Sequence, residues 1–223
     1  MNNNVGRRIM KSNLAKYEAF FGRPADATLA PRGESTFSCF VHRFPKRQVG
    51  FFKRLFTPLN DVCVYMTDGM SSSDMSLPPD LQKAYPCQVE LIACTEAPIV
   101  GGADNEDIVT RLLQWLAATV ADRQTFVGPM QSIDLGEVMC PNSEMTGFFF
   151  GVPDGVEMQR LCRCTSAAQL VVSVIPVTSA ELQIVQTSGP EALIQAFERE
   201  GVRNLFDPFR RGIAEQAMPP NGP

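Results

Sequence analysis

The sequence of 223 residues contains a single histidine, His42, and this scarcity limits the chemistry that the chain can perform. General acid–base catalysis near neutral pH and hydrolytic triads rely most often on histidine. His42 lies in an expected strand, and we interpret it as a structural residue. The serine run Ser71–Ser73 follows Gly69 without the Gly-x-Ser-x-Gly turn of hydrolases, so the sequence indicates no nucleophilic serine.

Long hydrophobic runs are also missing, since no stretch approaches the ~20 apolar residues that cross a bilayer. The longest apolar runs, Phe148–Val152 and Leu170–Val177, have the length of strands. The basic residues near Met1 are not followed by the apolar segment of a secretory signal. The sequence therefore predicts a cytoplasmic protein that binds no membrane.

The chain has no excess of positive charge, because 20 lysine and arginine residues face 24 aspartate and glutamate residues, for a formal net charge of −4. Proteins that bind nucleic acid usually carry excess positive charge, since contacts to phosphate supply much of their affinity. We therefore expect no nucleic-acid partner.

The segment Arg43–Phe56 departs from this balance, since it contains five basic residues, four phenylalanines and no acidic residue. One interpretation is a contact surface for an acidic protein partner or an anionic membrane. The interpretation that we prefer is a loop whose phenylalanines pack inwards while its charges face water, because solvated charge runs are common.

Seven cysteines are scattered through the sequence, and we interpret them as reduced, buried thiols because their number is odd and no secretory signal precedes them. The closest pairs of soft metal ligands are Cys39 with His42 and Cys162 with Cys164. Zinc sites usually combine two closely spaced pairs of such ligands. The sequence therefore predicts no metal site and no other cofactor.

The composition, with 44% hydrophobic and 20% charged residues, is that of an ordinary globular domain with one sizeable core. Helices are expected over residues 12–21, 104–120, 179–186 and 190–201. Strands are expected over residues 36–43, 62–67, 87–94, 132–135, 145–152 and 170–177. These elements alternate without a regular βαβ repeat, which favours an α+β fold: a mixed, largely antiparallel sheet with helices packed on it, in a single domain. We expect the domain to span residues 12–214, between a flexible segment at residues 1–11 and a disordered tail at residues 215–223.

Two of these elements carry specific expectations. Asp104 is expected to cap its helix, with Asp107 in the first turn, where a negative charge suits the helix dipole. The strand at residues 170–177 is almost continuously apolar, so we expect it to lie in the centre of the sheet with both faces covered.

Seven short blocks follow one another along the chain in a recognisable order. The first is Val64-Tyr65-Met66-Thr67-Asp68-Gly69-Met70-Ser71, a strand that ends in a Thr-x-Gly-Met-Ser turn, followed by Met75 and Pro78. The others are Cys87–Cys94 with its Glu90-Leu91 pair, Leu112–Val120, Thr125-Phe126 with Gly128, Thr146–Phe150, Val174–Leu182 and Asp207–Gly212. Together they resemble the suppressor-of-fused family over residues 12–214. The chain departs from the family pattern in a basic insertion around Lys46–Phe56 and in Tyr85-Pro86-Cys87.

The resemblance implies a non-enzymatic α+β domain that binds proteins. In animals, the family's namesake restrains a transcription factor through an extended peptide held between two lobes, and this chain resembles the first lobe. Stand-alone bacterial-type members resemble immunity proteins, which neutralise a toxin by covering its active surface. We therefore expect a toxin partner. The alternatives are a regulatory adaptor that sequesters a client by strand addition, and an enzyme that acts through Asp68, Glu90 or a cysteine–histidine pair.

The candidate residues for binding a partner lie in the turn after residue 67, in the third strand and near the C-terminus. They are Asp68, Met70, Ser71, Asp74, Glu90, Asp207, Arg210 and Arg211. Glu90 has a second interpretation as the structural partner of Arg210 or Arg211, because a buried carboxylate needs pairing. We prefer this structural interpretation, and we assign no catalytic and no metal-binding residues.

Overall fold

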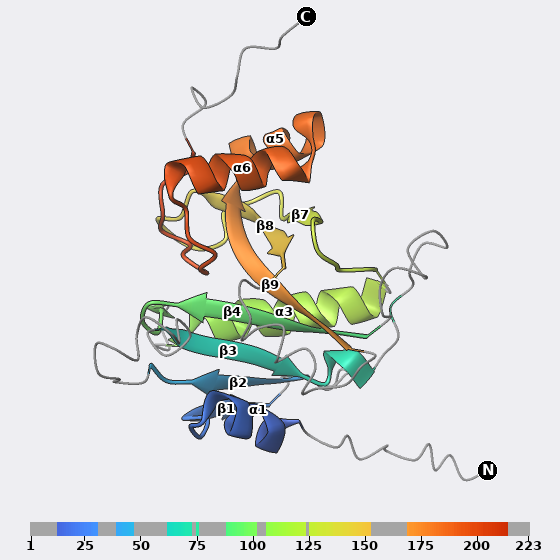
Figure 1. The fold of residues 1–223 in the computed structure, drawn as a ribbon, viewed down its shortest axis with the longest axis vertical. Helices are drawn as coiled ribbons and strands as arrows, with labels where there is room; N and C mark the ends of the chain where they lie inside the picture. The colour runs from blue at the N-terminus through green and yellow to red at the C-terminus, as the bar shows by residue number, and fades with distance from the viewer. Residues whose placement is uncertain are drawn as a thin grey trace, which may run out of the picture.

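The computed structural model of the chain describes residues 13–30, 39–46, 62–72, 75, 88–101, 106–123, 125–152 and 169–213 (Figure 1). Its helices are α1 (Leu14–Phe21), the short 3₁₀ helix η2 (Met70–Ser72), α3 (Ile108–Arg123), α5 (Ser179–Ser188) and α6 (Pro190–Glu200). Its strands are β1 (Ala27–Leu29), β2 (Phe40–Phe44), β3 (Cys63–Asp68), β4 (Gln88–Thr95), β5 (Val100–Gly101), β6 (Glu106–Asp107), β7 (Ser132–Asp134), β8 (Met145–Gly151) and β9 (Gln169–Thr178).

Seven strands form one sheet in the order β1-β2-β3-β4-β9-β8-β7, and β5 pairs with β6 in a separate two-stranded sheet. β4 and β9 run parallel, and the other neighbouring strands described in the large sheet run antiparallel. This arrangement confirms the predicted α+β fold, with a mixed, largely antiparallel sheet and helices packed on it in a single domain.

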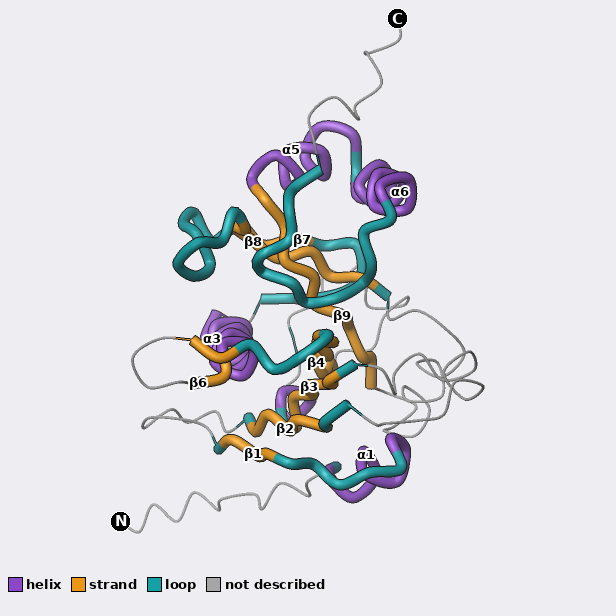
Figure 2. Tube along the Cα trace, turned by 90° about the vertical axis from the view of Figure 1, so that its left-hand side faces the viewer, coloured by secondary structure: helices purple, strands orange, loops and turns teal. Residues whose placement is uncertain are grey.

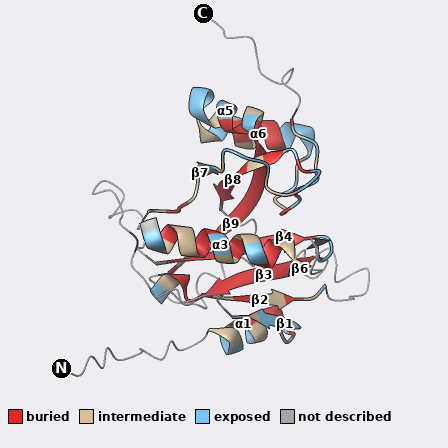
Figure 3. Cartoon of the chain, turned by 180° about the vertical axis from the view of Figure 1, so that it is seen from behind, coloured by how far each residue is buried: buried red, intermediate tan, exposed pale blue. Residues whose placement is uncertain are grey.

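Helices cover both faces of the large sheet (Figures 2 and 3). α3 covers one face, and its Leu113 joins Phe148 of β8 in the largest buried cluster. On the opposite face, α1 packs Tyr17 and Phe21 against β2, β3 and β4. α5 and α6 pack against β8 and β9 on that same face. Because both faces are covered, the central strands bury side chains of both orientations, which explains their nearly continuous apolar sequence.

β9 joins the two halves of the sheet, which confirms its predicted central position. Its first half, from Gln169 to Ser173, pairs with β4, and its second half pairs with β8. Beyond Ser173, β4 and β9 diverge, and the segment after α6 fills the fork between them (Figure 1). In this fork the Phe206 N–H donates to the Cys94 carbonyl oxygen at 2.7 Å, and the Ser173 hydroxyl donates to Asn204 Oδ1 at 3.0 Å.

The start of α3 differs from the expectation. The Asp107 carboxylate accepts hydrogen bonds from the backbone N–H groups of Val109 at 3.1 Å and Thr110 at 3.3 Å, and the helix begins at Ile108. Asp107 is therefore the capping residue, and its predicted place within the first turn was wrong, while Asp104 lies outside the described residues. The physical reason is that β6 ends at Asp107, so this residue has the extended backbone that a helix cap requires.

Three short strands escaped the sequence analysis. β1 lies between the helix predicted at residues 12–21 and the strand predicted at residues 36–43, and β5 and β6 were not expected either. With two or three residues each, they are too short to show a hydrophobic period. The ends predicted at residues 1–11 and 215–223, and most of the basic segment Arg43–Phe56, lie outside the described residues. Within that segment, Phe44 belongs to β2 and is fully buried, as its packing interpretation expected.

Candidate functional site

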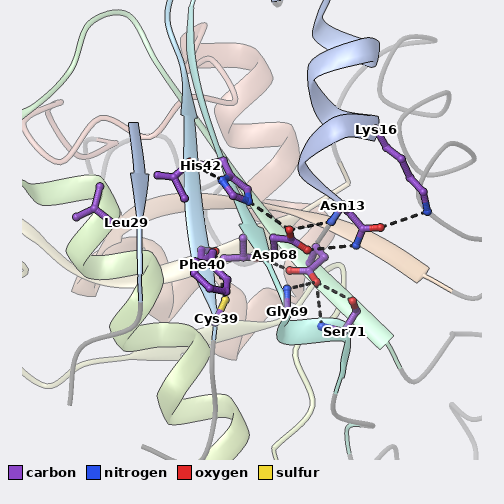
Figure 4. A network of polar contacts seen from close by, with 12 residues as sticks. Asn13, Lys16, Leu29, Cys39, Phe40, His42, Asp68, Gly69 and Ser71 are labelled. Carbon is purple, nitrogen blue, oxygen red and sulfur yellow. Dashed lines mark hydrogen bonds and ion pairs between the residues drawn. The ribbon is translucent and has the colours of Figure 1, made fainter. Parts of the chain in front are cut away.

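Glu90 on β4 is completely buried at the centre of a hydrogen-bond cluster. Its carboxylate accepts hydrogen bonds from the hydroxyls of Thr67 at 2.5 Å and Ser71 at 2.7 Å. The backbone N–H groups of Gly69 and Ser71 each donate to it at 3.0 Å (Figure 4). Burial raises the pKa of Glu90, and these hydrogen bonds act in the opposite direction. The cluster fixes the turn between β3 and η2, where Gly69 has a φ of +119° that favours glycine.

Glu90 therefore has a structural role, although its partners differ from the predicted ones. The expectation that Glu90 pairs with Arg210 or Arg211 was wrong, because Arg210 binds the carboxylate of Glu181 instead. The antiparallel pairing of β3 with β4 places Met66 opposite Ile92 and so brings the end of β3 beside Glu90. Donors from this neighbouring turn satisfy the carboxylate locally.

Asp68 and His42 form a second buried network next to the first (Figure 4). Asp68 Oδ2 lies 3.2 Å from His42 Nε2, and Thr28 Oγ1 lies 2.9 Å from His42 Nδ1. Asp68 also accepts hydrogen bonds from the backbone N–H of Asn13 at 2.9 Å and from its side-chain amide at 3.2 Å. Both ring nitrogens of His42 are thus occupied by the fold, which agrees with the structural interpretation of this residue. The network joins α1 to β1, β2 and β3.

Glu181 and Arg210 form a buried ion pair that fastens the C-terminal segment to α5. Glu181 is completely buried, and its two oxygens accept hydrogen bonds from the Arg210 guanidinium at 2.7 Å and 2.6 Å. The same carboxylate accepts the Ile213 N–H at 3.0 Å and the Thr178 N–H at 2.9 Å. The last bond completes a capping box, since Thr178 Oγ1 accepts from the Glu181 N–H. The Arg210 guanidinium also lies 5.1 Å from the centre of the Phe197 ring.

The predicted partner-binding residues fall into two groups in the structure. Asp68, Met70, Ser71 and Glu90 come together at the end of β3, where Ser71 is the half-buried member and the others are buried. The remaining described residues of the set lie in the segment after α6, and of these Asp207 and Arg211 are exposed. Asp74 lies outside the described residues. The residues in the segment after α6 are therefore more accessible to a partner than those at the end of β3.

A pocket of about 640 Å³ lies against the segment after α6, and we call it the fork pocket. Its walls are residues 95–100, from the end of β4 to the start of β5, and residues 200–203, 205–207 and 209–211. Val100 and Phe209 line it and are 56% and 50% exposed. Asp207, Arg210 and Arg211 also line it, so the fork pocket contains the second group of predicted residues.

A second hollow, of about 360 Å³, lies between α3 and the connection from β7 to β8. We call it the α3 groove. Trp115 and Val138 line it and are 46% and 56% exposed, and Arg111 and Glu137 contribute charges. Tryptophan, methionine and arginine are enriched in protein interfaces, and the α3 groove contains all three, with Met139 as the methionine.

Among the residues that the structure describes, no three histidine, cysteine, aspartate or glutamate side chains lie together in a way that would hold a metal ion. Cys162 and Cys164 fall outside those residues. No helix within the described ranges is long and apolar enough to cross a membrane.

Some residues of interest were missed by the sequence analysis. Glu181 had a visible signal, because Thr178-x-x-Glu181 has the spacing of a capping box. No signal in the sequence indicated that Trp115, Val100 and Phe209 are exposed. Large apolar residues are expected in the core when only the sequence is considered. Their exposure depends on how α3 and the segment after α6 pack on the sheet.

Comparisons with known proteins agree with this architecture. The family described as Suppressor of fused protein (SUFU) matches residues 51–211. The fold is similar to that of a SUFU (suppressor of fused protein) homolog from Neisseria gonorrhoeae FA 1090, with a TM-score of 0.61 and 14% identity over 92% of this chain and 96% of that chain. It is also similar to a chain of the Sufu–Fu complex, with a TM-score of 0.56 and 10% identity over 91% of this chain and 88% of that chain. No curated protein sequence matches this chain.

Proposed function

This chain belongs to the suppressor of fused family, and from that premise we propose that it is a regulatory module that works by binding another protein rather than by catalysis. The observation that carries the proposal is the family match over residues 51–211. The similarity in fold to a chain of the Sufu–Fu complex supports it, because that structure contains a complex of Sufu with Fu.

The buried polar residues support a binding role as well. A general acid or base must reach the proton that it transfers in a bound substrate. Glu90, Asp68 and Glu181 are at most 1% exposed, and each accepts several hydrogen bonds from the fold. His42, at 2% exposure, has both ring nitrogens engaged. These residues stabilise elements of the fold, whereas the fork pocket and the α3 groove are accessible hollows among the residues that the structure describes.

We further propose that the module is of the immunity or antitoxin type, with a toxin as its partner. A protein of this type neutralises its target by covering it, which requires exposed anchor residues and complementary shape. Trp115 and Phe209 are large, exposed side chains of that kind. The likeness to the Neisseria homolog covers 96% of that chain, so the two folds have a similar extent.

A regulatory adaptor that captures a client peptide is the second candidate. The open edges of the large sheet favour it, because β1 and β7 each have one strand neighbour among the described strands. A client segment in extended conformation can add to such an edge through main-chain hydrogen bonds. The edges are short, with three residues in each strand, so side-chain contacts would have to supply much of the affinity.

Both candidate functions require that the chain binds a protein partner, and affinity purification from the native cells tests this requirement. The tagged chain is expected to retain one dominant protein at a ratio of about one to one, whereas the same tag on an unrelated domain retains none. A search that recovers no partner at micromolar sensitivity contradicts the proposed function.

Fragments of the recovered partner then separate the two candidates. Overlapping linear peptides that bind nearly as tightly as the whole partner would identify an adaptor, because an adaptor recognises a short segment. Binding that requires the folded partner domain would identify the immunity type, because coverage of a toxin depends on its folded surface.

A further inference from the structure

We infer that the α3 groove binds an amphipathic helix of the protein partner. The apolar face of that helix packs against Leu112, Trp115 and Val138, and a basic residue beside this face lies opposite Glu137. The inference rests on the proposed function, and it specifies one surface of the chain and the kind of partner segment that fits it.

Helix α3 has apolar residues on two of its faces. The first face consists of core residues that are at most 2% exposed: Val109, Leu113, Leu116 and Val120. The second face consists of Ile108, Leu112 and Trp115, which have the spacing i, i+4 and i+7 and all line the α3 groove. Because a helix rises about 1.5 Å per residue, this outer stripe runs along α3 for roughly 10 Å. One apolar face suffices to pack a surface helix on its core, so the outer stripe is available to a partner.

The opposite wall of the groove is the connection from β7 to β8. Leu135 and Met139 of this connection, together with Leu112 of α3, are partly buried and pack against the core cluster. Trp115 and Val138 are instead 46% and 56% exposed. The groove therefore combines side chains that the core holds in place with large exposed ones, as expected of anchor positions in an interface.

The main chain around the groove favours a helical occupant over an extended one. The backbone groups along α3 bond within the helix. In the other wall, the N–H groups of Leu135 and Met139 donate to the carbonyl oxygens of Thr146 and Met145, both at 2.8 Å. An extended segment binds largely through main-chain hydrogen bonds, and these two walls offer few partners for them. A helix satisfies its own backbone groups and presents side chains, which is what an apolar groove accepts.

The charges of the groove specify the partner further. Eight of its ten lining residues are apolar, and the charged ones are Arg111 and Glu137. Glu137 is exposed, so a basic residue of the partner can pair with it and set the orientation of the bound helix. An anionic membrane is recognised by clusters of basic residues, whereas this lining has one base and one acid. The composition therefore fits a protein helix better than a lipid surface.

The fluorescence of Trp115 gives a direct test, because it is the only tryptophan in the sequence and it lines the groove. The probes are tryptophan-free helices, selected on the full chain from a library that randomises one face of a helix in a small helical bundle. A helix that covers Trp115 should shift its emission to shorter wavelength, because the indole leaves contact with water. A parallel library of unstructured linear peptides should yield no peptide that produces this shift.

Four variants of the chain then locate the bound helix, with affinities measured through a fluorescent label on the helix. Trp115→Ser removes an anchor and should weaken binding roughly tenfold or more. Glu137→Lys should weaken binding roughly threefold, and a glutamate in place of the facing base of the helix should restore it. Val152→Ser and Glu198→Lys make matched changes at exposed positions outside the groove and should leave the affinity unchanged.

The inference is overturned if no selected helix shifts the Trp115 emission, if Trp115→Ser and Glu137→Lys bind helices as the wild type does, or if linear peptides produce the same shift. An emission that changes with the concentration of the chain alone would also overturn it, because a second copy would then occupy the groove. Since Glu137 is exposed, Glu137→Lys should melt at the wild-type temperature, so its weaker binding is not a consequence of unfolding.

Failure of this inference is distinguishable from failure of the proposed function. If the native partner co-purifies equally well with Trp115→Ser and Glu137→Lys, the partner is held elsewhere, and the protein-binding function stands without the α3 groove. If no native partner is recovered with the wild-type chain, the proposed function itself fails.

Discussion

At the residue scale, three buried carboxylates stabilise this fold, and each obtains its hydrogen bonds from a different distance along the chain. Glu181 bonds to Thr178 in its own capping box and to Arg210 further on. Glu90 bonds to a turn that precedes it by about twenty residues, with separations of 19 to 23. Asp68 bonds to Asn13, at a separation of 55.

Replacement of Glu90 by glutamine tests the first cluster. An amide nitrogen cannot accept a hydrogen bond, so one of the donors around Glu90 loses its acceptor. We predict that Glu90→Gln lowers the free energy of unfolding by roughly 1–3 kcal/mol at acidic pH. Urea unfolding at a series of pH values measures this difference.

The pH dependence of that difference follows from the raised pKa of Glu90. Because burial raises this pKa above its ordinary value of 4.5, the folded chain binds the proton more tightly than the unfolded chain does. The resulting stabilisation is present at low pH and is lost as the pH rises through the folded pKa. Glutamine does not titrate, so the difference in the free energy of unfolding between the wild type and Glu90→Gln should become smaller as the pH rises. A gap that stays constant or widens contradicts this account.

The ion pair of Arg210 with Glu181 provides a second test at this scale. Arg210→Met leaves the buried Glu181 carboxylate without its cation, which should cost roughly 3–5 kcal/mol in the free energy of unfolding. Arg211→Met removes the neighbouring, exposed guanidinium and should change stability by less than about 0.5 kcal/mol. Equal losses in the two variants, measured by chemical denaturation, would show that the pair does not fasten the C-terminal segment.

The identity of the structural residues was predictable in part. The sequence indicates that Glu90 is paired, because an apolar strand surrounds it, and that Thr178 caps a helix, because the local spacing shows it. The partner of Glu90 was not predictable, because it depends on the register between β3 and β4. The same holds for Arg210, whose position beside Glu181 depends on the path of the chain through the fork.

At the scale of elements, α1 depends on a residue outside its own sequence. Its N-terminal residue Asn13 makes no side-chain cap, and the carboxylate of Asp68 on β3 accepts the Asn13 backbone N–H instead. A negative charge at this end also suits the helix dipole. Tyr17 and Phe21 then bury the inner face of α1 against the sheet.

Asp68→Asn tests this attachment of α1. The new amide nitrogen would face donors of Asn13 or His42, so the cap is weakened. We predict that amide hydrogen exchange in Leu14–Phe21 accelerates roughly tenfold relative to the wild type, while exchange in β4 and β9 changes much less. Asp122→Asn, at an exposed position of α3, is the control and should leave both regions unchanged. Exchange that rises equally throughout the sheet would contradict a local role for Asp68.

Long elements were predictable from the sequence and very short ones were not. The strand β9 shows an almost continuous apolar run within its ten residues, and the helix α3 shows its amphipathic period over sixteen residues. β1, β5 and β6 are set by pairing with neighbouring strands, which leaves no local pattern. The start of α3 differs from the prediction for a related reason. The pairing of β6 with β5 keeps the chain extended up to Asp107, so the helix begins after this residue.

At the scale of the whole molecule, the sheet consists of two halves that share β9, and the segment after α6 connects them. This segment contacts the end of β4 through Phe206 and the start of α5 through Arg210. The fork pocket lies at this junction, so its shape depends on both halves. The α+β class was predictable from the order of the elements. The fork was not, because the sequence does not show where β4 and β9 separate.

Native mass spectrometry of the chain isolated from its own cells measures whether this chain acts by binding one protein partner, as we propose. We predict a complex whose mass is that of the 24.5 kDa chain plus a different protein. A chain recovered alone, or with a tightly held metal ion or small molecule as its sole companion, would contradict it.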